Sequence, residues 1–430
     1  MGTFCGQTIY NHLVCPHFSC IEFSLSVMKI VPVFLFLLTL LLFNACQLAT
    51  AESASAESVQ VAQSNRLIEL SDKMVAYLPQ FPLDSLQIPR TVEDGEMKGT
   101  RSKSWTSGFF PGVLWQLYDV GRQDVIKKAA LNWQSFVEKE KFDSTTHDLG
   151  FKLYCSFGQA YRITGDEHFK DVFLTAANTL STRYNATVGA LRSWDHHEDI
   201  WAFPVIIDNM MNLEMLYEAT RLTGDSSYYH IATQHAETTL KNHFRGDNSS
   251  YHVVSYNPLT GEVEQKNTHQ GYSHESAWSR GQAWGLYGYT VAYRYTKQPE
   301  FLAQAQKISD FIFTHPNLPE DLIPYWDFDA PNIPDEPRDV SAAAVAASGL
   351  FELSTYDQEN ASRYLGWANQ ILNSLEKEEY QSNTAPFFLK HSVGSIPGEF
   401  EMDAPIIYAE YFYLEALRRS QASGDSTKIN

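Results

Sequence analysis

A short pattern that recurs along this chain constrains its fold more than any other feature. An apolar segment ends at an aromatic residue, a tight turn follows, and a second apolar segment begins. The clearest copies are Leu117–Asp124, Tyr161–Phe169 and Tyr217–Tyr228, with weaker copies at Tyr293–Phe301 and Leu353–Asp357. In such a turn, Gly takes the left-handed conformation that ends one helix, and the Asp after it caps the next. The repeats therefore predict a series of helical hairpins.

The spacing of apolar residues after these turns is that of a helix. From Phe169 to Leu180, apolar side chains recur at intervals of three and four residues. With a first helix near Asn65–Tyr77 and a last helix near Ala404–Arg418, the chain contains about twelve helices. Because the repeats are irregularly spaced, they favour an all-α (α/α)6 barrel, a closed ring of six hairpins, over an open solenoid.

The long connections between the hairpins would form the mouth of this ring. Loops that a rigid scaffold positions commonly carry function, and these connections contain the unusual polar residues. They are residues 144–148, 184–206, 245–280, 315–339 and 380–402.

The composition fits one large globular domain. Of the 430 residues, 44% are hydrophobic and 19% are charged, as expected of a folded chain. We place the domain at residues 64–420, followed by a tail at 421–430. The formal net charge of -19 argues against a nucleic-acid partner, because phosphate binding needs a basic surface. Aromatic residues reach 13%, which suits stacking on sugar rings, although core packing accounts for most of them.

Residues 1–46 contain a targeting segment. Lys29 precedes an apolar run over 30–43, which is shorter than the roughly 18 residues of a membrane-spanning helix. The run ends in Leu-Phe-Asn-Ala-Cys at 42–46, which resembles a bacterial lipobox. We therefore expect an exported protein whose lipidated Cys46 anchors it to a bacterial membrane, facing the periplasm or the cell surface. The alternative is cleavage near Ala45, which would give a soluble periplasmic protein.

The segments around this signal carry less information. Residues 47–63, rich in Ala, Ser, Glu and Gln, indicate a flexible tether, whereas residues 1–27 match no pattern. Four of the five Cys lie within the first 46 residues, and only Cys155 lies in the domain. The sequence therefore predicts neither a disulfide framework nor a cysteine metal site.

Two aspartates are the candidates for acid–base chemistry. Asp208 lies in an apolar segment over 203–211. Burial there should raise its pKa well above the reference of about 3.9, as a general acid requires. Asp148 opens another helix, and in a closed ring both carboxyls would face the same mouth, where the charge of Asp148 would raise the pKa of Asp208 further. For each residue the alternative is a helix cap.

A dense polar and aromatic stretch spans residues 268–284. A helix begins near Ser279 or Arg280, so Arg280 and Trp284, four residues apart, share one face. Arg280 would bind a carboxylate through paired hydrogen bonds, and Trp284 would stack beneath a ring. The alternative is a surface Arg and a core Trp. The only close cluster of His and carboxylates, Trp194–Asp199, cannot direct all its adjacent side chains at one ion, so we interpret it as a loop and expect no metal site.

Three motifs together resemble the unsaturated glucuronyl hydrolases of glycoside hydrolase family 88. They are His-Asp-Leu-Gly at 147–150, Ile-Asp-Asn at 207–209 and Arg-Gly-Gln-Ala-Trp at 280–284. The resemblance extends from about Ser104 to Pro405 and implies an (α/α)6 barrel. The family removes the 4,5-unsaturated uronic acid that polysaccharide lyases leave at the non-reducing end of oligosaccharides. We expect no cofactor, because protonating an enol ether needs only an acid and water.

The resemblance implies a role for each matching residue. Asp208 would protonate C4 of the enol ether and help activate the water that adds at C5, and Asp148 would bind the sugar and tune Asp208. Pro397 stands where some members that prefer sulfated glycosaminoglycans have a Lys, which puts a preference for that sulfate position in doubt. The residues implied in substrate binding are His147, Asn209, His252, Gln270, Arg280, Trp284, Ser392 and Ser395.

Other functions fit part of the sequence. Unsaturated rhamnogalacturonyl hydrolases share the fold and the hydration chemistry, although the combined motifs favour the glucuronyl group. A surface lipoprotein that only binds oligosaccharides would use aromatics and Arg, but it has no use for a buried carboxylic acid. Glycosaminoglycan, algal ulvan and related polymers yield the same unsaturated end, so the sequence sets neither the parent polymer nor the oligomeric state.

Overall fold

The computed structural model describes residues 65–424, which form a helical barrel. The predicted signal segment at 1–46 with Cys46, the tether at 47–63 and residues 425–430 of the predicted tail lie outside the described residues. No helix between residues 65 and 424 is long and apolar enough to cross a membrane. The twelve α-helices of this range are residues 65–77, α2 (Phe109–Gly121), α3 (Asp124–Ser135), α4 (Gln159–Thr164), α5 (Glu167–Ser181), α6 (Leu213–Thr223), α7 (Ser226–Asn242), α8 (Ser279–Thr296), α9 (Pro299–Thr314), α10 (Val340–Tyr356), α11 (Ala361–Leu375) and α12 (Ile407–Gly424).

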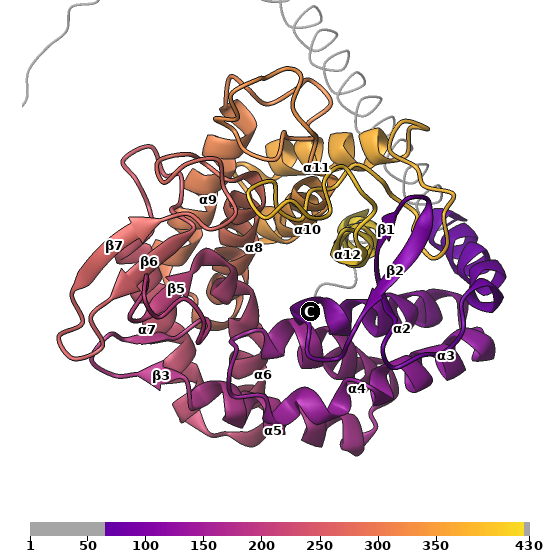
Figure 1. The fold of residues 1–430 in the computed structure, drawn as a ribbon, viewed down its shortest axis with the longest axis horizontal. Coiled ribbons are helices and arrows are strands. Elements are labelled where there is room, and N and C mark those ends of the chain that lie inside the picture. Colours follow the sequence, from indigo (N-terminus) through magenta and orange to yellow (C-terminus); the bar gives the residue numbers. More distant parts are fainter. Residues whose placement is uncertain (1–64, 425–430) are drawn as a thin grey trace, which may run out of the picture. The chain divides into compact units, whose positions relative to one another are not determined.

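The even-numbered helices form an inner ring. Each contacts the next one, except that α6 meets the helical segment Gly150–Gly158 directly before α4, and α12 packs back against α2, which closes the circle. The odd-numbered helices α3, α5, α7, α9 and α11 lie outside it (Figure 1). Nearly every residue of α8 and α10 is buried, because an inner helix is covered on all sides by protein. The predicted (α/α)6 barrel is confirmed.

Two of the three clearest turns adopt the predicted geometry. Gly165 and Gly224 end their helices in the left-handed conformation, with φ of 70° and 76°. The side chain of Asp166 then caps α5 by accepting a hydrogen bond from the N–H of His168 at 3.0 Å, and Asp225 caps α7 in the same way. Glycine suits these two turns because a residue with a side chain is strained in the left-handed conformation.

The first turn differs from the prediction. Gly121 stays within α2, and Arg122 takes the left-handed conformation instead, with φ of 50°. A side chain at Gly121 would lie 2.4 Å from Oγ of Ser71. This glycine therefore allows two helices to approach closely. Gln123 is the N-cap residue of α3, and its side chain makes no capping hydrogen bond.

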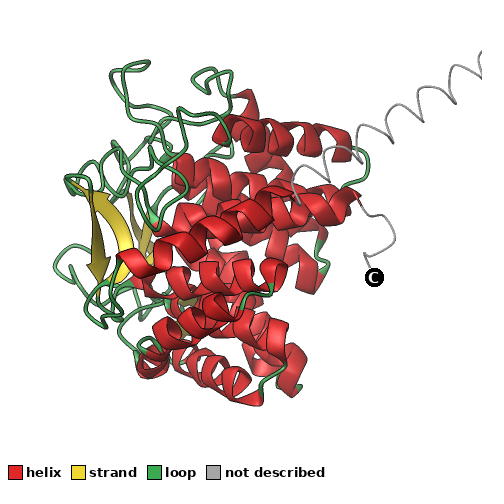
Figure 2. Cartoon of the chain, turned by 90° about the vertical axis from the view of Figure 1, so that its right-hand side faces the viewer, coloured by secondary structure: helices red, strands yellow, loops and turns green. Residues whose placement is uncertain are grey.

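Short strands, absent from the predicted pattern, build the connections at one end of the barrel (Figure 2). All pair antiparallel. Connections 184–206 and 245–280 meet where Val205 lies opposite Val254. The strands are β1 (Ile88–Glu93) with β2 (Glu96–Thr100), β3 (Tyr184–Asn185) with β4 (Ala190–Leu191), and β5 (Pro204–Ile206), β6 (Val253–Tyr256) and β7 (Val263–Asn267) in one sheet.

Shorter helical turns connect these elements. The 3-10 helices are η1 (Leu78–Gln80), η2 (Trp105–Gly108), η3 (Glu138–Phe142) and η5 (Ile207–Asn212).

A π-helix, η4 (Gly150–Gly158), begins the second inner helix and continues directly into α4. Its widened backbone presses against the start of α2. A Cβ atom at Gly108 would lie 2.1 Å from the carbonyl oxygen of Lys152, and one at Gly112 would lie 2.4 Å from that of Cys155. Only glycine permits this approach, so α2 fixes the position of η4 and of the residues that precede it.

Candidate active site

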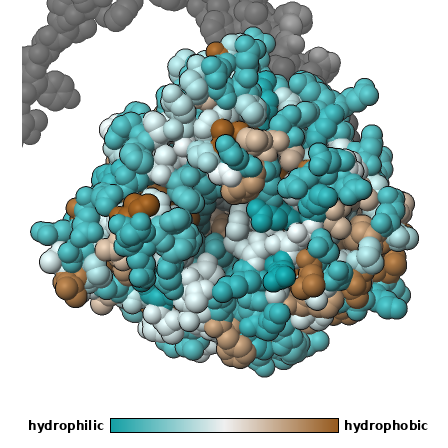
Figure 3. Space-filling view, in the orientation of Figure 1, coloured by the Kyte–Doolittle hydropathy of each residue, from teal (hydrophilic) through white to brown (hydrophobic). Residues whose placement is uncertain are grey.

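A cavity of about 790 Å³ opens at the end of the barrel where the connections gather. Figure 3 shows it as a hollow near the centre of that face, bordered by hydrophilic residues. Four of the five connections predicted to carry function contribute to its wall; 315–339 does not. Six predicted site residues line it: His147, Asp148, Asp208, Gln270, Arg280 and Ser395.

Asp208 lies in η5, directly after β5. Its side chain is 10% exposed, and its Oδ2 has no hydrogen-bond partner among residues 65–424. Burial raises the pKa of Asp208 to about 7; Arg280 opposes this shift, and the charge of Asp148 adds to it. The helix makes no side-chain capping bond, and its cap residue is Ile206, so the capping alternative is not supported. The carboxyl can therefore donate and accept a proton near neutrality.

Asp148 precedes η4 and faces the same cavity. Its Oδ2 accepts a hydrogen bond from Oγ1 of Thr146 at 2.5 Å, and its Oδ1 lies 3.2 Å from Nε2 of His147. The residue that caps η4 is Leu149, with no side-chain bond, so Asp148 does not act as a cap either. The structure thus brings the two predicted carboxyls to one cavity, and neither side chain caps a helix.

His252 lies behind Asp208. Its Nδ1 accepts hydrogen bonds from the backbone N–H groups of His269 and Gln270, each at 3.1 Å. Burial lowers the pKa of His252 well below its ordinary 6.5, so the ring is neutral. Its one proton then lies on Nε2, which is 3.6 Å from Oδ2 of Asp208. His252 therefore places an N–H near the acid without adding a positive charge.

Arg280 lines the cavity, but the protein itself occupies most of its guanidinium. Nη1 donates to the carboxylate of Asp339 at 3.0 Å and to the carbonyl of Val393, and Nη2 donates to the carbonyl of Gly394 at 2.7 Å. Gln270 also donates to the carbonyl of Gly394, at 3.0 Å. These bonds fix the connection that carries Ser395, and the paired bonds between Arg280 and a substrate carboxylate stay a prediction.

Four predicted residues lie behind the wall and do not line it: Asn209, His252, Trp284 and Ser392. Trp284 packs between the rings of Phe151 and Phe412, with ring centroids 5.4 Å apart in each case. In this structure Trp284 therefore lies in the core, as the alternative has it, and its stacking beneath a sugar stays a prediction. Because α8 begins at Ser279, as predicted, Arg280 reaches the cavity while Trp284, one turn later, already lies in the core.

The wall also contains aromatic residues to which the sequence motifs assign no role. They are Trp105, Trp194, His196, His269 and Phe400. Two of them, Trp194 and His196, belong to the cluster at 194–199, whose sequence predicts only a loop. Asp195 of that cluster is bound by the buried Arg183 at 2.9 and 3.1 Å, which fixes the loop against the barrel. Within residues 65–424 no group of three or more His, Cys, Asp and Glu is placed to hold a metal ion.

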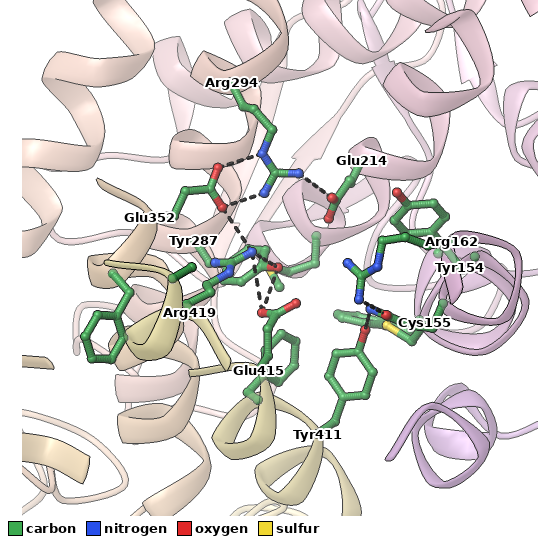
Figure 4. Close-up of a pocket in the computed structure, with 18 of the residues that line it drawn as sticks. Tyr154, Cys155, Arg162, Glu214, Tyr287, Arg294, Glu352, Tyr411, Glu415 and Arg419 are labelled. Atoms are coloured by element: carbon green, nitrogen blue, oxygen red, sulfur yellow. Dashed lines mark hydrogen bonds and ion pairs between the residues drawn. The ribbon is translucent and has the colours of Figure 1, made fainter. Parts of the chain in front are cut away.

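A second cavity, of about 320 Å³, lies toward the opposite ends of the inner helices (Figure 4). Its carboxylates are engaged by arginines: Arg294 pairs with Glu214 and Glu352, and Arg419 pairs with Glu352 and Glu415. Burial alone would raise the pKa of Glu352, but Arg294 and Arg419 outweigh it and lower this pKa to about 2, so Glu352 cannot act as an acid near neutrality. Ion pairs across this cavity therefore join helices α6, α8, α10 and α12.

Comparisons with known proteins agree with this geometry. A family model, Glycosyl Hydrolase Family 88, matches residues 86–327. An unsaturated glucuronyl hydrolase of Formosa agariphila is 46% identical over 382 residues, which is 87% of this chain and 94% of that protein. A crystal structure of an unsaturated glucuronyl hydrolase specific for heparin has 44% identity and a TM-score of 0.78, over 84% of this chain and 96% of that chain.

A further solved structure is that of an unsaturated glucuronyl hydrolase mutant of Streptococcus agalactiae complexed with dGlcA-GalNAc6S. It has 30% identity and a TM-score of 0.70, over 83% of this chain and 90% of that chain. The region that the family model matches includes Asp148, Asp208 and Arg280. The chain therefore belongs to glycosyl hydrolase family 88.

Proposed function

We propose that this protein removes the 4,5-unsaturated glucuronyl residue from the non-reducing end of oligosaccharides produced by polysaccharide lyases. One observation carries the proposal: Asp208 is a buried carboxyl whose pKa is raised to about 7, and it faces the same cavity as Asp148. A module that only bound sugars would not need such a group. The names of the relatives, unsaturated glucuronyl hydrolases, support the same activity.

The chemistry follows from the enol ether of the unsaturated sugar. Protonated Asp208 transfers its proton to C4, and the positive charge develops at C5 and the ring oxygen. Water then adds at C5 and gives its proton to the Asp208 carboxylate, which restores the acid. The resulting hemiketal opens to a C5 ketone, and the hemiacetal left at C1 releases the aglycone as an alcohol.

Residues around Asp208 keep its proton available. The charge of Asp148 raises the pKa of Asp208, and the neutral ring of His252 adds no opposing charge. A cationic imidazolium 3.6 Å away would favour the carboxylate and remove the acid. We propose that the reaction requires neither a metal nor an organic cofactor, because protonating an enol ether needs only an acid and water. Protein treated with a chelator should therefore keep its full activity.

The substrate class is the finer part of the proposal. The heparin specificity in the name of one relative and the dGlcA-GalNAc6S complex of another support unsaturated ends derived from glycosaminoglycans. Ulvan-derived ends and unsaturated rhamnogalacturonyl ends are the alternatives.

A panel of lyase products, each followed by loss of the absorbance of its conjugated double bond, tests activity and substrate class together. The expected result is turnover of unsaturated glucuronyl disaccharides. Turnover of rhamnogalacturonyl products alone would replace the proposed activity, and binding without turnover would support the non-catalytic alternative.

We also propose that the protein is exported and lipidated at Cys46. The lipobox-like sequence at 42–46 after a short apolar run supports this. Mass spectrometry of the mature N-terminus should find a diacylated Cys46. An unmodified peptide that begins near Ala45 would instead indicate a soluble periplasmic protein.

A further inference from the structure

The substrate of the proposed function is an anion, and the cavity offers it few cations. Among the described residues, Arg280 and Lys103 are the only Arg and Lys that line this cavity. The guanidinium of Arg280 is bound to Asp339 and to two backbone carbonyls. Its charge is therefore largely balanced before a substrate enters.

The other ionisable groups of the wall add no positive charge at neutral pH. Burial lowers the pKa of His147, His196 and His269 below the ordinary 6.5. The acidic residue Asp143 is balanced by the buried Lys152 at 2.9 Å, as Asp195 is by Arg183. Lys103 is thus the one cation of the wall with no carboxylate partner among the described residues.

The backbone of Lys103 is fixed, whereas its side chain is exposed. Its carbonyl accepts a hydrogen bond from Nζ of Lys152 at 3.4 Å. On one side, the buried Ser102 donates to Oε1 of Glu140 at 2.6 Å. On the other side, Ser104 caps η2. The anchored backbone limits where the ammonium group can reach, so that only the rotamers of the side chain must be ordered when a ligand binds.

The position of Lys103 decides which part of the substrate it meets. The terminal unsaturated uronate must reach Asp208, which is buried in the wall of the cavity. The next sugar then extends toward the mouth, where the exposed Lys103 lies. Pro397, where some family members have a Lys, lines the same cavity and provides no charge.

We propose that Lys103 is a specificity-determining residue that binds a sulfate ester on the sugar next to the unsaturated uronate. The inference rests on the proposed function and deepens it, because it names sulfated disaccharides as the preferred substrates. An ammonium group binds a sulfate through charge-assisted hydrogen bonds, which an uncharged side chain cannot replace. Lys103 thereby supplies, from the segment before η2, a positive charge to the cavity that Pro397 also lines without one.

The test compares unsaturated glucuronyl–N-acetylgalactosamine without sulfate and with one sulfate at 4-O or 6-O of the amino sugar. For Lys103→Gln, the KM for at least one sulfated form should rise about three- to tenfold, the range for losing one partly exposed charged contact. The kcat should stay unchanged, and the unsulfated sugar should change less than twofold. Lys103→Arg should restore most of the preference, and added salt should weaken sulfated binding only while Lys103 is present.

Lys139→Gln is the matched control, because Lys139 is exposed and lies outside the cavity wall. Equal effects of the two variants would mean that overall charge, and not a contact, sets the preference. An unchanged ratio of sulfated to unsulfated KM in Lys103→Gln would overturn the proposal, and so would equal weakening of both sugars, which would place Lys103 at the uronate.

Equilibrium binding separates this inference from the proposed function. Both sugars are titrated into the full chain carrying Asp208→Asn, with and without Lys103→Gln. Loss of the preference for the sulfated sugar in the variant that also carries Lys103→Gln would support the inference. If the wild-type protein turned over neither sugar, only the proposed function would be overturned. Absence of binding to any of these sugars would overturn both.

Discussion

At the scale of single residues, turnover in the cavity depends on the carboxyl proton of Asp208. Asp208→Asn keeps the size and hydrogen-bonding capacity of the side chain but cannot deliver a proton to C4. We expect turnover of an unsaturated disaccharide to fall by at least about a hundred- to ten-thousand-fold, the usual range for general acid–base catalysis. Binding and the melting temperature should change little. Asp310→Asn on the outer helix α9 is the control, and a stable Asp208→Asn that retained most of its activity would remove Asp208 from the mechanism.

The pH dependence follows from the same carboxyl. Because the pKa of Asp208 is about 7 and the protonated form is the active one, kcat/KM should fall as pH rises through about 7. Asp148→Asn removes a charge that raises this pKa, so the alkaline limb should move to lower pH while turnover also drops. A pH profile of both proteins tests this. A flat wild-type profile between pH 6 and 9 would contradict the assignment of Asp208 as the acid.

The site residues were predictable to different degrees. Asp208 could be found because an acid among apolar neighbours at 203–211 is costly unless it has a use. The role of Arg280 could not, because its partners Asp339, Val393 and Gly394 are distant in the sequence. Trp284 shares a helix face with Arg280 but does not line the cavity, because helical spacing gives the face of a residue and not how far a cavity extends along the helix.

At the scale of elements, the contact between α2 and η4 holds the segment that carries Asp148. Gly108→Ala would place a methyl group 2.1 Å from the carbonyl oxygen of Lys152, which is backbone and must move. We expect a loss of about 1–3 kcal/mol in the free energy of unfolding, typical of overpacking, together with a fall in kcat/KM. Urea denaturation and disaccharide turnover measure the two effects.

The matched control for that contact is Gly366→Ala in the outer helix α11, where a Cβ atom would meet nothing within 4 Å. Alanine is the better helix former by about 1 kcal/mol, so this variant should be neutral or more stable. If both substitutions had the same effect, close packing would not explain the glycine at position 108.

The hairpins were predictable because local chemistry defines their turns. Gly165 with Asp166, and Gly224 with Asp225, each contain a helix stop and a helix start within two residues. The strands were not predictable, since β5 has three residues and its partner β6 comes from a connection about fifty residues later, roughly the length of one hairpin. Pairing between such segments leaves no periodic signal in either one.

At the scale of the whole molecule, the buried ion pairs far from the mouth should make stability depend on pH. The folded-state pKa of Glu352 is lowered from 4.5 to about 2. Its stabilising contribution is therefore complete above about pH 4.5 and is lost as pH falls toward 2. The shift of about 2.5 units corresponds to about 3 kcal/mol.

Glu352→Gln should accordingly reduce the free energy of unfolding at pH 6, and the difference from the wild type should shrink at pH 3. Urea denaturation at both pH values checks this, with the exposed Glu300→Gln as the control. A difference between the proteins that stayed constant from pH 6 to pH 3 would contradict the assignment.

The π-helix also means that the number of residues in Gly150–Gly158 helps to determine where the side chain of Asp148 points. An α-helix advances by about 100° per residue, so deleting one residue within Gly150–Gly158 would tighten the coil and turn Asp148 away from Asp208 by about that angle. No side-chain substitution can compensate for such a rotation. Insertions and deletions among relatives should therefore fall in connections such as 245–280 and be absent between Asp148 and α4. A deletion of one residue between Asp148 and α4 should abolish turnover, whereas a deletion of one residue in a connection should be tolerated.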